Sequence, residues 1–113
     1  MFKSILNVLI ISWLISAASA FAFDNSKPTL LFFTAPWCKY CQVAKHDIDN
    51  DKELSETIKG YDVVFLDHDL DKDLVEGYNI KTLPTFIIFK NGKQTGRKEG
   101  YGGGARGLNK FLK

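Results

Sequence analysis

The chain has 113 residues, of which 45% are hydrophobic and 25% are charged, and its formal net charge is +2. This length suits one domain, and the composition is too apolar for a disordered chain. The small net charge does not indicate nucleic-acid binding, which needs a concentrated basic face, and two cysteines are too few for a four-thiolate zinc site or a scaffold of several disulfides.

The first twenty residues have the pattern of a secretory signal peptide. A lysine precedes a mostly apolar run over 5–15, and Ala18-Ser19-Ala20 places small residues at the two positions that a signal peptidase reads. We expect cleavage after Ala20, with Ala22 as the second choice, and therefore predict a mature domain over 21–113. The alternative is an uncleaved membrane anchor, because residues 4–23 carry no charge. In either case we expect the domain outside the cytoplasm, in a periplasmic or otherwise exported location.

The mature chain is predicted to begin with a strand and two helical pieces. The short apolar run Thr29–Phe33 has the length and bulk of a fully buried central strand. A helix is expected from Cys38 onward, because Pro36 stands just ahead of its start. A second helical piece follows, with Asp51 as its N-cap and Gly60 as its stop.

The middle of the chain is predicted to form a strand and a short helix. Asp62–Leu66 is an apolar run of strand length, which we interpret as another buried strand. Residues 71–78 are typical of a short helix, with Leu74, Val75 and Tyr78 facing inward.

A hairpin and a closing helix complete the predicted order. Thr85–Lys90 is followed by Asn91-Gly92, a strong hairpin signal, so residues 93–99 are expected to return as an antiparallel strand. This strand has little apolar bulk, and we place it at the sheet edge, where its lysines discourage edge pairing. A glycine-rich segment over 100–104 leads into a helix over 105–112. The predicted order is β-α-β-α-β-β-α, an α/β fold with a central mixed sheet flanked by helices.

Charged residues are distributed unevenly along the mature chain. Residues 47–76 include 11 acidic and 3 basic side chains, a net charge of −8, whereas residues 77–113 include 1 acidic and 8 basic, a net charge of +7. Such blocks are usually the solvated faces of a folded domain. The alternative is a dipole that orients a protein partner.

A four-residue window, Cys38-Lys39-Tyr40-Cys41, carries the predicted chemistry. It is a C-x-x-C that follows a strand and begins a helix, so the two sulfurs can approach disulfide geometry across the first helical turn. The positive end of the helix dipole and nearby unpaired N–H groups stabilise the thiolate of Cys38, the form that attacks a disulfide. Cys41, one turn further along, is placed to resolve the mixed disulfide that Cys38 forms.

Other interpretations of the two cysteines stay open. They can form a purely structural disulfide, although so short a loop stabilises little in the loop-entropy model. They can hold a metal ion completed by His46 or His68, although neither histidine has zinc-finger spacing, or share an Fe–S cluster across a dimer. We expect His46 on a helix surface and His68 in a solvated loop. A different functional class is a module that binds or delivers copper or another soft metal.

Two motifs together resemble the thioredoxin superfamily: Trp37-Cys38-x-x-Cys41 after a buried strand, and Leu83-Pro84-Thr85 ahead of the next one. The similarity runs from about Thr29 to the C-terminus. The resemblance implies that Pro84 follows a cis peptide bond beside the dithiol, and that the backbone of Leu83 pairs with an extended substrate segment. It also implies that Trp37 forms part of a hydrophobic lip, and Gly100 matches the family's glycine near the same surface.

The chain departs from the thioredoxin pattern in its N-terminus and its core. Only residues 21–28 precede the first strand of the mature chain, so the strand and helix with which thioredoxins open are missing and the core is trimmed toward glutaredoxin size. Phe32 occupies the position of the family's buried Asp, and Phe65 aligns with the Lys usually paired with it, so packing replaces an ion pair. Proton transfer at Cys41 then needs another group. Candidate substitutes are Glu53, Asp67 and Asp69.

The residues between the cysteines give conflicting indications of direction. Lys39 adds a positive charge that favours the Cys38 thiolate and makes the dithiol more oxidising than one with the Gly-Pro pair typical of thioredoxins. Tyr40 before the second cysteine is similar to glutaredoxins and some exported disulfide isomerases, whereas the Trp37 motif is closer to thioredoxins and exported reductases.

The sequence therefore predicts an exported thiol–disulfide oxidoreductase, a reductase more than an oxidase, with Cys38 as nucleophile and Cys41 as resolving thiol. Its expected substrates are thiols and disulfides of exported proteins, with electrons from a membrane partner protein and without a bound cofactor or metal. Nucleic acid is not an expected partner, and the domain is expected to be a monomer. The residues expected to tune the redox pair are Lys39, Tyr40 and Trp37. Those expected to bind substrate are Trp37, Leu83, Pro84 and Gly100.

Overall fold

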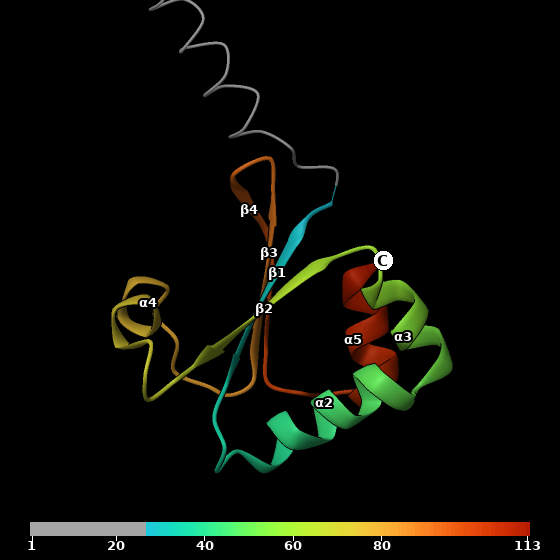
Figure 1. Cartoon of the computed structure of the whole chain (residues 1–113), viewed down its shortest axis with the longest axis horizontal. Helices are drawn as coiled ribbons and strands as arrows, with labels where there is room; N and C mark the ends of the chain where they lie inside the picture. Colours follow the sequence, from blue (N-terminus) through green and yellow to red (C-terminus); the bar gives the residue numbers. More distant parts are fainter. Residues whose placement is uncertain (1–26) are drawn as a thin grey trace, which may run out of the picture.

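A computed structural model describes residues 27–113 of the chain. The predicted signal peptide, its two candidate cleavage positions and the alternative anchor lie outside the described residues. The described elements follow the predicted order, with the first helical region in two pieces (Figure 1). They are β1 (Thr29–Thr34), α2 (Lys39–Asn50), α3 (Lys52–Ile58), β2 (Asp62–Asp67), α4 (Lys72–Gly77), β3 (Thr85–Lys90), β4 (Lys93–Glu99) and α5 (Gly104–Leu112).

Within residues 27–113 the strands form one four-stranded mixed sheet in the order β2-β1-β3-β4. β1 runs parallel to β2 and antiparallel to β3, and β3 pairs with β4 in an antiparallel hairpin. The prediction of a buried central strand is confirmed for β1, where Leu30, Phe32 and Phe33 are fully buried. They are buried because β1 has a strand on each side and apolar clusters on both faces of the sheet.

β2 lies at the edge of this sheet, which corrects the prediction of a buried strand over 62–66. Val64 and Phe65 are 41% and 54% exposed, and Leu66 is the buried residue of the strand. Within the described part of the chain β2 pairs with β1 alone. An apolar run of strand length therefore does not determine whether the strand has one neighbour or two.

The short helix α4 also differs from its prediction. Val75 and Tyr78 pack against the smaller buried cluster as expected, but Leu74 is 41% exposed. The helix has six residues and lies alone against its face of the sheet. It therefore presents a narrow apolar stripe, and Leu74 stands beside that stripe.

The hairpin and the helix caps follow the sequence signals. Asn91 and Gly92 both have positive φ, at 54° and 76°, as a tight hairpin turn requires. β4 is the other edge strand of the sheet, which confirms the prediction. A bulge interrupts its pairing with β3. Asp51 ends α2 and caps α3, accepting the amide N–H of Leu54 at 3.0 Å.

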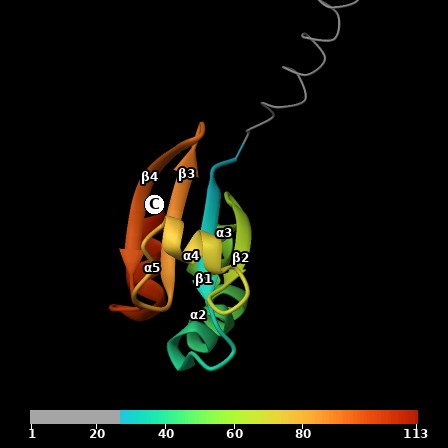
Figure 2. The ribbon, with the colours of Figure 1, turned by 90° about the vertical axis from the view of Figure 1, so that its left-hand side faces the viewer.

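The helices cover the two faces of the sheet unequally, with α2, α3 and α5 on one face and α4 on the other (Figures 1 and 2). The larger buried cluster lies under the three helices and includes both cysteines. It includes Phe32, whose ring centroid lies 5.3 Å from that of Phe65 and 4.6 Å from that of Phe86. The expected contact between Phe32 and Phe65 is thus confirmed, although Phe65 covers it from the exposed edge strand.

No helix within residues 27–113 has both the length and the apolar character needed to cross a bilayer.

Candidate redox site

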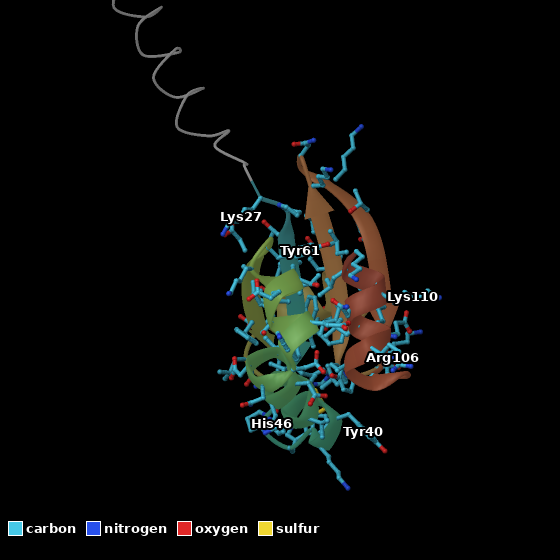
Figure 3. The ribbon with its side chains drawn as sticks, turned by 90° about the vertical axis from the view of Figure 1, so that its right-hand side faces the viewer. Lys27, Tyr40, His46, Tyr61, Arg106 and Lys110 are labelled. Atoms are coloured by element: carbon cyan, nitrogen blue, oxygen red, sulfur yellow. A yellow bond between two sulfur atoms is a disulfide. The ribbon has the colours of Figure 1, made fainter. Side chains whose placement is uncertain are left out.

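The two cysteines are joined in a disulfide at the start of α2, with their Cα atoms 5.2 Å apart. Cys38 is the N-cap residue of α2, and its sulfur accepts the backbone N–H of Cys41 at 3.2 Å. The backbone N–H of Cys38 donates to the carbonyl of Ala35 at 3.1 Å, which fixes the turn between β1 and the helix. Figure 3 shows the sulfurs near the labelled Tyr40, at the end of the domain opposite Lys27.

The two sulfurs differ in access. Cys41 is fully buried, whereas Cys38 keeps 7% of its surface exposed at the helix terminus. The first turn of α2 carries no acidic side chain, so its orphan N–H groups and the helix dipole act unopposed there. The geometry therefore favours an attacking thiolate on Cys38 and leaves Cys41 able to reach its partner from inside the fold.

Trp37 lies beside the disulfide in a contact network that the sequence did not predict. It is 64% exposed, and its Nε1 donates to Asp69 at 2.8 Å. The Nδ1 atom of His68 lies 3.0 Å from the other carboxylate oxygen, and the His68 ring meets the Trp37 ring edge-on at 5.8 Å. The hydrogen bonds from His68 and then Trp37 lower the pKa of Asp69. His68 is therefore in a loop, as expected, but it contacts the site.

The loop before β3 and the segment after β4 are also joined at this end of the fold. The Leu83–Pro84 peptide bond is cis, and the carbonyl of Pro84 accepts the backbone N–H of Gly100 at 2.7 Å. Leu83 packs against the cluster that contains both cysteines. Gly100 has a φ of 78°, a conformation that disfavours any side chain.

None of the three candidate proton carriers contacts the disulfide through a hydrogen bond within residues 27–113. Asp69 is bound by Trp37 and His68, and Asp67 accepts backbone N–H groups within its own loop. Glu53, in the first turn of α3, lines a hollow between α3 and α5. The structure thus brings none of them into hydrogen-bond contact with the disulfide among the described residues.

A second contact that the sequence did not indicate joins α2 to the segment after β4. The hydroxyl of Tyr101 donates to a carboxylate oxygen of Asp47 at 2.7 Å. Burial and this hydrogen bond raise the pKa of Tyr101. The two residues are 54 positions apart, and no local pattern links them.

The described residues offer no support for a metal site. Within 27–113 there is no group of three or more His, Cys, Asp or Glu side chains that is arranged to hold an ion. His46 is 74% exposed on its helix, as expected, and its closest acidic partner is Asp47 at 3.7 Å. The interpretation of the cysteines as metal ligands gains nothing from this geometry.

The fold and the site together define a small dithiol–disulfide protein with a mixed sheet and a redox pair at a helix N-terminus. A family model described as a thioredoxin-like domain matches residues 17–113, and the chain belongs to this family.

Known sequences agree with the family. The chain is 41% identical over 78 residues to thioredoxin Y2, chloroplastic, of Arabidopsis thaliana, which covers 68% of this chain and 45% of that protein. It is 33% identical over 78 residues to a thioredoxin of Rickettsia felis, and this match covers 68% of this chain and 71% of that protein. The chain spans less than half the length of the first of these relatives.

Solved structures agree with the fold. A thioredoxin from Trypanosoma brucei brucei superposes with a TM-score of 0.65 at 25% identity, covering 77% of this chain and 73% of that one. A thioredoxin-fold protein from Helicobacter pylori superposes with a TM-score of 0.71 at 23% identity, and the match covers 78% of this chain and 68% of that one. At this identity the likeness supports the fold alone.

Proposed function

We propose that this protein is an exported thiol–disulfide oxidoreductase that reduces disulfides in other exported proteins. The observation that carries the proposal is the unequal placement of the two cysteines: Cys38 is the N-cap of α2 and keeps 7% of its surface exposed, whereas Cys41 is fully buried behind it. Membership in the thioredoxin-like family supports the same chemistry.

The reaction uses both cysteines in two exchange steps. In the reduced protein the Cys38 thiolate attacks one sulfur of a substrate disulfide, forms a mixed disulfide and releases the other substrate sulfur as a thiolate that takes up a proton. Cys41 then loses its proton and attacks Cys38, which releases the second substrate thiol. The substrate gains two electrons and two protons, and the protein is left with the disulfide seen in the structure.

The surface around Cys38 is suited to an extended substrate segment. Trp37 offers an exposed apolar face. The family resemblance assigns strand addition to the backbone of Leu83, which stands ahead of the cis bond. Gly100 stands next to Pro84 and lets a partner backbone approach closely. Lys39 and Tyr40 are both exposed in the redox window, where they tune the thiolate and the potential.

The proposal includes a direction of electron flow, toward the substrate, and an exported location. The similar sequences from Arabidopsis thaliana and Rickettsia felis are named thioredoxins, which favours a reductase. The charged, apolar and small-residue pattern of residues 1–20 favours export. Each turnover consumes two electrons, and we propose that a membrane partner protein returns them to the domain, which acts as a monomer.

The test of the chemistry uses two serine variants of residues 21–113. Cys38→Ser removes the nucleophile, so reduction of a protein disulfide should fall to the uncatalysed rate. Cys41→Ser keeps the nucleophile but cannot resolve the intermediate, so it should accumulate a mixed disulfide that mass spectrometry detects. His46→Asn, an exposed control on the same helix, should keep the wild-type rate. Exchange that survives in Cys38→Ser would refute the assignment.

The direction is tested by the reduction potential of the pair, equilibrated against glutathione. We expect a value near or below about −230 mV, toward thioredoxin. A value above about −180 mV would indicate an oxidant or a disulfide-shuffling enzyme instead.

A further inference from the structure

A recess of about 300 Å³ is lined by Tyr40, Tyr101 and Gly102. Tyr40 stands between the two cysteines in the sequence, and its side chain is 63% exposed. One lining residue of the recess is therefore covalently next to Cys41, and the others belong to the segment after β4, which Tyr101 joins to Asp47 of α2.

One wall of this recess is held in place by contacts from three directions. The Tyr101 hydroxyl is bound to Asp47 at 2.7 Å, and its ring centroid lies 6.4 Å from that of Phe86 in the core. The carbonyl of Gly102 accepts from Nζ of Lys98 at 3.0 Å. Tyr40, on the facing side, is an exposed ring on the first turn of α2. The recess thus has one wall held by these contacts and an exposed aromatic ring, Tyr40, among its other lining residues.

The reaction itself brings a substrate to this place. A mixed disulfide ties the substrate's cysteine to Cys38, so the residues next to that cysteine must lie within a few ångströms of Tyr40. The wall is also connected to the proposed strand-addition loop, because Gly100, which precedes Tyr101, donates to the carbonyl of Pro84 at 2.7 Å. A bound substrate segment therefore passes both surfaces at once.

We propose that the recess is a specificity subsite for an aromatic or large aliphatic side chain next to the reactive cysteine of the substrate. This inference rests on the proposed function. Two tyrosine rings supply apolar and aromatic contact area, and burying the exposed Tyr40 ring against such a side chain is favourable. The volume suits one large side chain, and the positive charge of Lys98, which donates to the carbonyl of Gly102, disfavours a cationic one.

The test compares two peptides that differ only at the residues flanking their cysteine. Both carry the cysteine as a mixed disulfide with the same small thiol, and the flanking residues are phenylalanine in one peptide and alanine in the other. We expect the reduced protein to act on the phenylalanine peptide with a kcat/KM about fivefold higher, mostly through a lower KM. The ratio between peptides is insensitive to the protein's own potential, because that potential is common to both reactions.

A glycine substitution fills the recess without straining the backbone. An added Cβ at Gly102 meets no atom within 4 Å, and its φ lies outside the left-handed region. Gly102→Leu should therefore remove the preference for phenylalanine while the alanine peptide reacts as before. Gly77, at the end of α4, is equally open, so Gly77→Leu is the matched control and should keep the full preference. Tyr40→Ala removes the ring itself and should also abolish the preference.

The experiment distinguishes a failure of the proposed subsite from a failure of the proposed oxidoreductase function. Equal kcat/KM values for the two peptides, or a preference that persists in both Gly102→Leu and Tyr40→Ala, would overturn the subsite. Failure of the wild-type protein to reduce either peptide would instead overturn the proposed function. If glutathione disulfide reacts faster than both peptides and Gly102→Leu slows that reaction, the recess binds glutathione and the proposed occupant is wrong.

Discussion

Tyr101 connects the helix that carries the redox pair to the segment that follows the hairpin. Its hydroxyl donates to Asp47 on α2, and its ring lies against Phe86. Burial first, and then the hydrogen bond and negative charge of Asp47, raise the pKa of Tyr101 above its ordinary value of 10.0. A pKa that is higher in the folded than in the unfolded chain means that the favourable contribution is complete below about pH 10 and is lost as the pH rises beyond it.

Tyr101→Phe should reveal this contribution directly. At pH 8 the substitution is expected to lower the free energy of unfolding by about 1.5 kcal/mol, the lower end of the range for a hydrogen bond to a charged group, because it removes one hydrogen bond to a carboxylate. At pH 11 the difference between wild type and variant should shrink, because unfolding then allows the wild-type hydroxyl to ionise. Urea unfolding of the wild type and the variant measures the difference in their free energies of unfolding at each of the two pH values. If this difference is the same at both pH values, the raised pKa of Tyr101 does not contribute to stability and the prediction is wrong.

Residue-level predictions succeeded where the information was local or inherited from the family pattern. The contact of Phe32 with Phe65 follows from their alignment with a buried pair, and the structure places the rings 5.3 Å apart. The partners of Asp69 and Asp47 were not predictable in this way. Their hydrogen-bond partners lie 32 and 54 positions away in the sequence, and only the assembled sheet brings them together.

At the scale of elements, the loop between β2 and α4 is a preformed support for Trp37. Asp67 accepts the backbone N–H groups of Asp69 and Leu70 at 2.8 and 3.2 Å, and Asp71 accepts that of Asp67 at 2.7 Å. The loop therefore presents the carboxylate of Asp69 to the indole in a fixed position. Because the pKa of Asp69 is lowered by His68 and Trp37, this link is complete above its ordinary pKa of 3.8 and is lost as the pH falls through the lowered value.

Asp69→Ala should release Trp37. Trp37 is the one tryptophan of residues 21–113, so its fluorescence anisotropy reports the indole alone. We expect the anisotropy to fall and KM for a protein disulfide to rise about threefold, as expected for one lost hydrogen bond of ordinary strength. Asp73→Ala, an exposed acidic residue of α4, is the matched control and should change neither quantity. An unchanged anisotropy in Asp69→Ala would show that the loop does not hold the ring.

Element predictions failed for a common physical reason. β1, the hairpin turn at Asn91 and the cap at Asp51 depend on local sequence, and all three appear as predicted. Whether β2 is central or at an edge depends on which other strands exist, and its apolar run carries no information about them. The exposure of Leu74 likewise depends on how much of the sheet α4 covers.

At the scale of the whole molecule, the disulfide links redox chemistry to folding. The Cys38–Cys41 bond constrains the unfolded chain, and a loop of this size contributes about 2 kcal/mol in the loop-entropy model. The reduced folded protein gains an opposing stabilisation, because the N-terminus of α2 and Lys39 favour the Cys38 thiolate. The balance of the two contributions decides whether folding favours the disulfide or the dithiol, and therefore which way electrons flow.

For the proposed reductase, the stabilisation that the disulfide gives the oxidised protein must exceed the stabilisation that the Cys38 thiolate gives the reduced protein. The oxidised protein should then be more stable than the reduced protein by up to about 2 kcal/mol, which corresponds to a potential about 40 mV below that of the unfolded dithiol. Urea unfolding of residues 21–113 with and without reductant measures the difference. Lys39→Ala should widen it, because the substitution removes a charge that stabilises the reduced form, and a double Cys38→Ser, Cys41→Ser variant should show no dependence on reductant. A reduced protein that is more stable than the oxidised one would mean that folding drives the pair toward the dithiol, and the protein would then act as an oxidant.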